Sequence, residues 1–196
     1  MSGKIKIDRR SRQTRQRIGG AFLKLGGVQA INLITVDGLA REAGIARSTF
    51  YSHYEGIDDY IARSFANMLS STANSELGVQ ALPIRAILEH IAVSGEGARA
   101  LLKYRNYAKM MRRGENALRE VAAKRLRDQP QIMDEIERKL LATMLAAGFI
   151  SMLQDWIEQD RTLSIDEVVR RFEAMESKLL CAPKIYPTTL TGSADR

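Results

Sequence analysis

The stretch that most constrains this chain is Thr35–Tyr54, which reads TVDGLAREAGIARSTFYSHY. Thr35 stands where its hydroxyl can cap the first free N–H groups of a helix. Gly44 can end that helix, and a second short helix follows from about Ala46. Two helices joined by a short turn containing Gly are typical of a helix-turn-helix, whose second helix enters the major groove of DNA. The apolar face of the first helix has the spacing i, i+3, i+4 and i+7: Val36, Leu39, Ala40 and Ala43.

The second helix carries the side chains that reading DNA requires. Arg47 can donate two hydrogen bonds to guanine O6 and N7. Ser48 and Thr49 are short and tolerate close approach to bases, while Tyr51 offers a ring for a thymine methyl group. Phe50 can turn inward as the anchor of the helix. The alternative interpretation of this pattern is an ordinary helical hairpin in an all-α protein.

Three further residues stand at the ends of the two helices, where contacts to the DNA backbone are made. Thr35 lies at the start of the first helix, and His53 and Tyr54 follow the second. We therefore predict phosphate contacts from these three side chains, with Arg41 as a weaker candidate. Core packing is the alternative role of Tyr51 and of Tyr54, and helix capping is that of His53.

This stretch resembles the DNA-binding region of TetR-family transcriptional regulators. The matching elements are Thr35-Val36, Leu39-Ala40, Ala43-Gly44-Ile45 and Phe50-Tyr51-Ser52-His53-Tyr54. The resemblance covers about residues 10–65. It implies an all-α fold, with an N-terminal three-helix helix-turn-helix DNA-binding domain and a C-terminal helical ligand-binding and dimerisation domain. The chain departs from the family at Ala46, where a polar cap is usual, and at Gly56–Asp59, where a Lys that meets phosphate is common.

Positive charge gathers at the N-terminus. Residues 1–17 hold seven Lys or Arg against Asp8, a net charge of +6. Residues 1–10 show no helical period, so we predict a mobile arm followed by a first helix over 11–27, capped by Ser11. The arm is either a solvated tail or a contact to phosphates and the minor groove. The candidate arm contacts are Arg9, Arg10 and Arg12.

The remainder of the chain has helical periodicity and no strand alternation. Helices are predicted over 57–77, from Pro83 to the glycines at 95 and 97, and over 98–112, 116–127, 131–158 and 165–180, the last capped by Ser164. The predicted organisation is a DNA-binding domain over 1–56, ordered from 10, an effector-binding and dimerisation domain over 57–181, and a flexible tail over 182–196.

The last two helices are the predicted dimer surface. Residues 140–154 are uncharged and more apolar than one helix of a small domain needs, and Trp is enriched at interfaces. In the resembled family these helices pair across a twofold axis. The two helix-turn-helix domains of the dimer, here called reading heads, then bind half-sites ~34–36 Å apart or a multiple of that distance. Closure of an intramolecular core is the alternative. The predicted interface residues are Phe149, Met152, Leu153, Trp156 and Phe172.

Residues 98–127 combine a strong basic charge with aromatic and Met side chains. Ten Lys or Arg face two Glu, a net charge of +8. The segment is either a solvated basic face or part of a ligand pocket between helices. The resemblance implies such a pocket, in which a small molecule changes the spacing of the two reading heads. An anionic ligand could meet Arg105 or Lys109. The candidate effector contacts are Tyr104, Tyr107, Met110 and Met111.

Composition narrows the function further. A net charge of +7 over 196 residues favours a polyanionic partner, and the lone Cys181 fits a reducing cytoplasm. The chain lacks metal-binding, phosphate-binding and nucleophile motifs, so we expect no enzymatic activity, no metal and no cofactor. No signal peptide or membrane span is expected, because the longest uncharged stretch is too short to cross a bilayer.

These features together predict a cytoplasmic homodimer that binds a palindromic double-stranded operator. The dimer would act as a transcriptional repressor, released by a small-molecule effector of unknown identity. The alternative is a nonspecific, architectural nucleic-acid-binding protein without an effector, whose binding would collapse with salt and ignore sequence.

Overall fold

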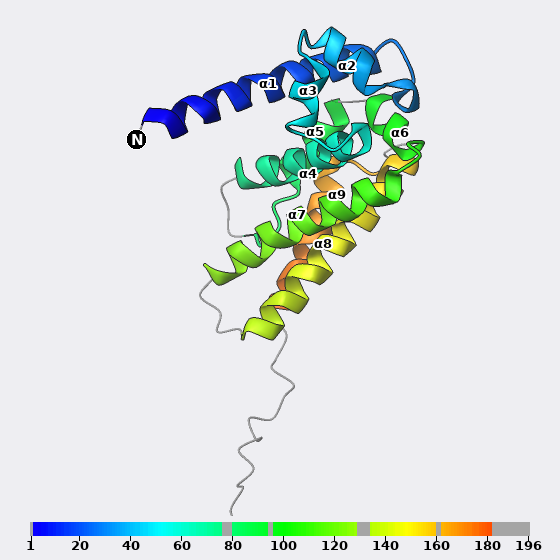
Figure 1. Ribbon diagram of the computed structural model, residues 1–196. Coiled ribbons are helices and arrows are strands. Elements are labelled where there is room, and N and C mark those ends of the chain that lie inside the picture. The colour runs from blue at the N-terminus through cyan, green and yellow to red at the C-terminus, as the bar shows by residue number, and fades with distance from the viewer. Residues whose placement is uncertain (1, 76–79, 94–95, 129–133, 160–161, 182–196) are drawn as a thin grey trace, which may run out of the picture.

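The computed structural model describes residues 2–75, 80–93, 96–128, 134–159 and 162–181, and these form helices, turns and loops without a strand (Figure 1). The all-α prediction is therefore confirmed. The helices are α1 (Ser2–Gly26), the single 3-10 turn η1 (Ile31–Leu33), α2 (Val36–Glu42), α3 (Arg47–Tyr51), α4 (Ile57–Ser75), α5 (Arg85–Val93), α6 (Glu96–Leu102), α7 (Tyr107–Arg127), α8 (Glu135–Glu158) and α9 (Ile165–Leu180).

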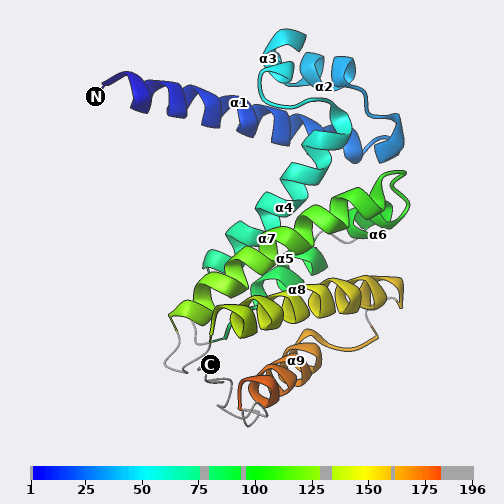
Figure 2. The same ribbon diagram turned by 60° about the horizontal axis from the view of Figure 1, so that its bottom comes forward.

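The first three helices form a small unit at one end of the molecule, and α8 and α9 lie at the other end (Figure 2). Ile18 of α1, Leu39 of α2 and Phe50 of α3 are fully buried and join one core. These positions follow the apolar periodicity of the sequence. The predicted helix-turn-helix is thus present, and α4 leads from it into the rest of the chain.

The C-terminal part is built around α7, which packs most extensively against α4 and α8. Gly114 makes the α4 contact possible. A Cβ atom there would lie 2.7 Å from both Leu69 and Phe65 of α4, which is closer than side-chain carbons approach. On the other side of the domain, α5 packs against α9.

Two predicted helix boundaries are wrong. The structure has one continuous α7 where the sequence suggested a break near Gly114, because this Gly serves helix packing rather than chain reversal. The break instead falls at residues 103–106, between α6 and α7.

The predicted mobile arm is also wrong, since α1 begins at Ser2 and Ser11 lies inside it. No Gly or Pro interrupts residues 4–18, and Arg, Lys and Gln are good helix formers. A helix anchored by Ile18 can therefore extend toward the N-terminus without a core of its own. Its N-terminal half projects from the body of the molecule (Figures 1 and 2).

The caps at the later helices follow local sequence. Ser164 accepts a 3.2 Å hydrogen bond from the Glu167 N–H at the start of α9, as predicted. Asp134 and Glu137 form a reciprocal capping box at the start of α8. The break predicted after residue 77, the start of the 131–158 helix and the tail over 182–196 lie wholly or partly outside the described residues.

Helix α8 is long and apolar enough to span a membrane by length and composition alone. Half of that apolar stretch is nevertheless buried inside the protein. Its buried positions include Leu145, Phe149 and Leu153, which belong to the main core. Core packing therefore accounts for its composition.

Candidate DNA-binding surface and ligand cavity

The turn of the helix-turn-helix is held from both sides. Thr35 Oγ1 accepts a 3.2 Å hydrogen bond from the Gly38 N–H, which caps α2 as predicted. Gly44 adopts a φ of 61°, a left-handed conformation that costs little only for Gly. Arg17 of α1 donates a 2.6 Å hydrogen bond to the Gly44 carbonyl. The path of the chain from α2 into α3 is therefore fixed by both α1 and α2.

Helix α3 presents the side chains predicted to read bases. Arg47 and Ser48 are exposed, and Thr49 is half-buried. Tyr51 is 48% exposed, with its ring edge-on to Phe50. The Thr49 N–H bonds to the Ala46 carbonyl, and Ala46 has no side chain to cap the N–H groups of Arg47 and Ser48, which remain available to a phosphate.

Arg47 already has a partner in the free protein. Its Nε lies 2.8 Å from Asp37 Oδ1 on α2, and both side chains are more than half exposed. An exposed ion pair contributes only ~0–1 kcal/mol, so Arg47 can exchange Asp37 for a guanine at small cost. Asp37 meanwhile holds the guanidinium at the surface of the motif.

Tyr54 is a core residue rather than a phosphate contact, and the prediction for it is wrong. It is 7% exposed, and its ring lies 5.4 Å from Phe50 and 5.1 Å from Tyr60. Burial raises the pKa of its hydroxyl, although Arg15 and Arg63 oppose the shift. His53 beside it is half-buried, and Thr35 is exposed.

The basic residues assigned to the arm lie on a helix. Arg9, Arg10 and Arg12 are all exposed on the projecting half of α1. Because α1 also contributes Ile18 to the core of the helix-turn-helix, these arginines are held at a fixed position relative to it. A rigid basic helix next to a reading helix is suited to contacts with the phosphate backbone.

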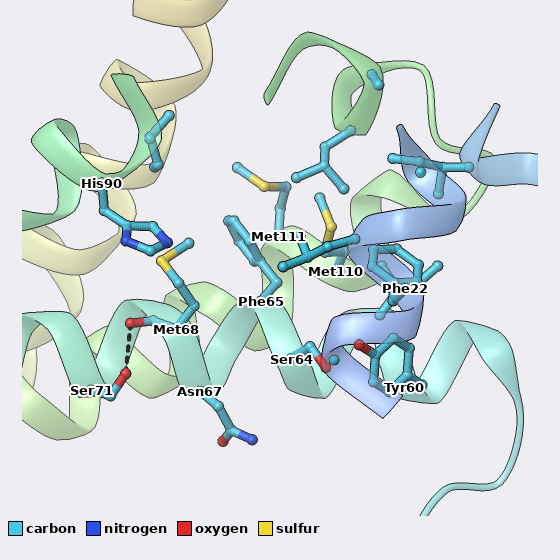
Figure 3. A pocket seen from close by; sticks show the side chains of 18 of the residues that line it. Phe22, Tyr60, Ser64, Phe65, Asn67, Met68, Ser71, His90, Met110 and Met111 are labelled. Atoms are coloured by element: carbon cyan, nitrogen blue, oxygen red, sulfur yellow. Dashed lines mark hydrogen bonds between the residues drawn. The ribbon is translucent and has the colours of Figure 1, made fainter. Parts of the chain in front are cut away.

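A cavity of about 1080 Å³ opens between α1 and the C-terminal helices (Figure 3). Three predicted effector contacts line it: Tyr107, Met110 and Met111. Its volume is at the upper end of the range for small-molecule sites, roughly 300–1,000 Å³. Side chains labelled in Figure 3 extend into this space from α1, α4, α5 and α7.

Tyr104 is not among the residues that line the cavity. It is buried and its hydroxyl donates a hydrogen bond to Asp58 at the start of α4. Arg105 lies 3.3 Å from the same carboxylate, and neither Arg105 nor Lys109 lines the cavity. Asp58, which stands near the point where the resembled family tends to have a Lys, therefore joins α4 to the α6–α7 turn.

Most of the cavity wall was not predicted. Helix α1 supplies Arg12, Arg15 and Phe22, and α4 supplies Phe65 and Met68. These residues belong to helices whose apolar faces were evident, but a helical period does not say which face lines a void. The sequence offered no signal that α1, a helix of the reading head, would form part of a ligand site.

A second carboxylate at the start of α4 is buried and makes two ion pairs. Asp59 is 4% exposed and pairs with Arg63 at 2.9 Å and with Arg113 of α7 at 2.7 Å. Burial alone would raise its pKa, but the bonds from the Glu55 N–H and the two arginines outweigh burial and lower the pKa. The carboxylate therefore stays charged and fastens α4 to α7.

Four of the five predicted dimer residues belong to the core of a single protomer. Phe149, Leu153, Trp156 and Phe172 are each at most 6% exposed, and Phe149 packs edge-on against Phe172. Met152 is half-buried. The alternative of an intramolecular core therefore holds for these four residues, because the inner faces of α8 and α9 are as apolar as an interface.

The same two helices also carry an exposed apolar face, hereafter the α8–α9 stripe. Ile136, Leu140 and Met144 follow one another at i, i+4 and i+8 on α8, and Leu140 is 59% exposed. Met175 and Leu179 are exposed at i and i+4 on α9. Contiguous exposed apolar residues of this kind mark interaction sites.

Comparisons with known proteins agree on one class. A family model described as a transcriptional regulator C-terminal region matches residues 83–178. The HTH-type transcriptional regulator AcrR of Shigella flexneri is 26% identical over 210 residues, which cover 94% of this chain and 98% of AcrR.

Solved structures of similar fold include the dihydroxyacetone kinase operon activator DhaS, with a TM-score of 0.60 and 16% identity over 85% of this chain and 96% of DhaS. A TetR transcriptional regulator from Streptococcus agalactiae 2603V has a TM-score of 0.55 and 24% identity, over 89% and 99% of the two chains. The repressor AlkX from Dietzia has a TM-score of 0.53 and 17% identity, over 83% and 96%.

Proposed function

Because the chain belongs to the TetR family of transcriptional regulators, we propose that it is a dimeric repressor that binds a specific DNA operator and is released by a small molecule. It acts in the cytoplasm and catalyses no reaction. The observation that carries this proposal is the exposure of Arg47, Ser48 and Tyr51 on a helix fixed by buried Phe50.

Specific binding requires both base and backbone contacts. Arg47, Ser48, Thr49 and Tyr51 are proposed to read bases. Thr35 and His53 are proposed to hold the backbone at the two ends of the motif. Helix α1 adds further phosphate contacts through exposed arginines: Arg9, Arg10 and Arg12.

A dimer supplies the second reading head that a palindromic operator needs. The α8–α9 stripe is proposed as its interface, since it lies at the opposite end of the molecule from α3 (Figure 2). For two copies joined there to bind one operator, the twofold axis must turn both α3 helices toward the same duplex. Buried residues of α8 and α9, such as Phe149 and Phe172, support this surface from behind.

The effector is proposed to bind the 1080 Å³ cavity. One wall of the cavity belongs to α1 of the reading head and the others to α4–α8 of the C-terminal domain. A ligand that contacts both can favour one arrangement of the two domains, and only such a difference in affinity shifts the equilibrium. The proposed domain boundary lies at residues 56 and 57, between the helix-turn-helix and α4.

Selection of bound fragments from genomic DNA at near-physiological salt tests the proposal. Enrichment of a palindrome with two half-sites one helical turn or a multiple apart is expected. Recovery of fragments without a common sequence, with affinity that falls steeply with salt, would instead support the architectural alternative. A reporter gene placed behind the selected operator then gives the sign of regulation. Transcription should rise when the protein is removed, and a fall would identify an activator.

A further inference from the structure

Helix α4 divides the cavity into two environments. Its residues Ile61, Phe65 and Met68 form an apolar wall, whereas Ser64, Asn67 and Ser71 form a polar one at the spacing i, i+3 and i+7. Ser71 already donates a 3.1 Å hydrogen bond to the Met68 carbonyl, and the Ser64 side chain extends toward α1 in Figure 3, whereas that of Asn67 points away from α1. A ligand that fits must therefore be amphipathic.

The apolar part of the cavity is deep and adaptable. Met110 and Met111 of α7 are buried, and they extend toward Phe65 and Met68 (Figure 3). Unbranched Met side chains adjust their shape to the ligand that they meet. Phe22 of α1 closes this region on the reading-head side. An extended hydrocarbon segment matches this lining better than a rigid polar molecule does.

The charged groups of the lining all come from one face of α1. Arg12, Arg15 and Gln16 lie on the same helical stripe as Gly19 and Phe22, with the i+3, i+4 spacing of a single face. No Asp or Glu is present among the described residues that line the cavity. This stripe therefore offers two guanidinium groups and no competing carboxylate.

Tyr107 of α7 lines the cavity near negative charge. The Tyr107 hydroxyl is buried and has no hydrogen-bond partner among the described residues. Burial, together with the carboxylates of Glu158 and Asp155, raises its pKa to about 12. The hydroxyl therefore stays protonated, and an anion beside it would also lie near two carboxylates. An anionic group belongs at the α1 end.

We propose that this cavity binds an amphipathic carboxylate, whose head group pairs with Arg12 and Arg15 of α1 and whose hydrocarbon tail lies among Phe65, Met68, Met110 and Met111. Its role as the effector rests on the proposed function, whereas its binding does not. Guanidinium and carboxylate form charge-assisted, bidentate hydrogen bonds, which are stronger than neutral ones. The bound anion ties α1 to α4 and α7, and α1 in turn holds the turn before α3 through Arg17.

Gly19 supports this assignment. It lines the cavity, and a Cβ atom added there would meet no atom within 4 Å. The absent side chain leaves free space between the arginines and Phe22, where the head group and the first part of a tail would pass. Substitution by a larger residue should fill this space and leave the core untouched.

Calorimetric titration of the full chain tests the proposal with three probes of equal length: decanoate and decylammonium, each below its critical micelle concentration, and decan-1-ol below its solubility limit. Decanoate should bind one per chain, at least about tenfold more tightly than the other two. The R12Q/R15Q variant should reduce this preference to less than about threefold. The matched R9Q/R10Q variant removes the same charge from exposed positions of α1 outside the cavity, and it should retain the preference. Gly19→Leu should weaken all three probes.

Several results would overturn the proposal. These are an unchanged preference in R12Q/R15Q, an equal loss in R9Q/R10Q, decylammonium binding as tight as that of decanoate, or no saturable binding of decanoate. Fragment selection without any probe separates the two proposals. If a palindromic operator is selected but the chain does not prefer decanoate, the carboxylate inference alone is wrong. If decanoate is preferred through Arg12 and Arg15 but no palindrome is selected, the ligand class is supported and the proposed function is wrong.

Discussion

The side-chain carbonyl of Asn32 accepts a 3.1 Å hydrogen bond from the backbone N–H of Arg105. The amide group of Asn32 also donates to the Lys103 carbonyl at 3.1 Å. One exposed side chain thus joins the connector before the helix-turn-helix to the α6–α7 turn. Leu101 and Leu102, which directly precede that turn, line the cavity. A ligand that displaces α6 would therefore also move the connector before the helix-turn-helix, through Asn32.

Asn32→Ala should loosen this junction without unfolding the protein. Two exposed hydrogen bonds contribute about 1–2 kcal/mol together, so thermal stability should fall only slightly. Hydrogen exchange of the Arg105 amide should accelerate. Asn116→Ala, at an exposed position of α7, is the matched control and should leave that exchange rate unchanged. An unchanged rate in Asn32→Ala would show that the junction is not held by this side chain.

Arg47→Ala should relax base preference at one position of each half-site and weaken binding by ~1–3 kcal/mol for each base that Arg47 no longer reads. Arg41→Ala, on the exposed face of α2, should instead weaken binding equally on all sequences, as removal of a phosphate partner does. Competition binding against a panel of single-base operator variants measures both. A uniform loss of affinity for Arg47→Ala would show that this side chain binds phosphate.

Tyr51→Ala and Tyr54→Ala should separate DNA binding from folding. Tyr54 packs between Phe50 and Tyr60, so its truncation should lower the free energy of unfolding by about 3–5 kcal/mol. Tyr51 is half-exposed, and its truncation should reduce operator affinity with a much smaller loss of stability. Chemical denaturation and operator titration of the two variants give the comparison. Equal losses of stability would contradict the assignment of Tyr54 to the core.

Asp59→Asn should lower stability by about 2–3 kcal/mol at neutral pH. Loss of a fully buried pair costs more, about 3–5 kcal/mol, but Arg63 and Arg113 are each more than a third exposed. Asp166→Asn is the control, because its ion pair with Arg85 is at the surface and should contribute about 1 kcal/mol or less. Urea denaturation at pH 7 measures both changes.

The pH dependence of Asp59 has a defined sign. Its pKa in the folded protein lies below the ordinary value of 3.8, so the unfolded chain binds its proton more readily. Its contribution is therefore fully present above about pH 4 and is lost as the pH falls through the lowered value. The stability of Asp59→Asn should fall less steeply below pH 4 than that of the wild type. Parallel acid denaturation curves would contradict the charged state of Asp59.

Leu140→Glu should dissociate the proposed dimer while each protomer stays folded. Across a twofold axis the new carboxylate would be desolvated or would face its own copy, and either arrangement is unfavourable. Val93→Glu makes the same change at a position of α5 that is 91% exposed and should leave the dimer intact. Sedimentation velocity over a range of concentrations reports the outcome. A Leu140→Glu chain that remains dimeric would place the interface elsewhere.

Local features were readable from the sequence because their causes lie within a few residues. The Thr35 cap, the left-handed Gly44 and the inward Phe50 each depend on neighbours along the chain. Tyr54 was misassigned because its environment is made by Tyr60 on the next helix. Gly114 was read as a break because the reason for it, the approach of Phe65, is a contact between distant segments.

The dimer surface and the cavity were not predictable from the sequence for the same reason, since both depend on how distant segments pack. Helix α8 is apolar on more than one face, so periodicity could not separate Phe149 in the core from Leu140 at the surface. The cavity wall from α1 depends on how two domains meet, and no property of Arg12 or Arg15 in the sequence distinguishes them from Arg9 and Arg10.

Helix α1 serves two purposes at once, since Ile18 completes the core beneath the helix-turn-helix and Phe22 lines the cavity. If the cavity binds an effector as proposed, a substitution on this wall would also disturb the packing beneath the helix-turn-helix. Relatives that respond to different molecules should therefore have diverged mainly at α5, α6 and α7, and kept the α1 side of the chamber. Sequence differences among such relatives would then be distributed unevenly around one cavity.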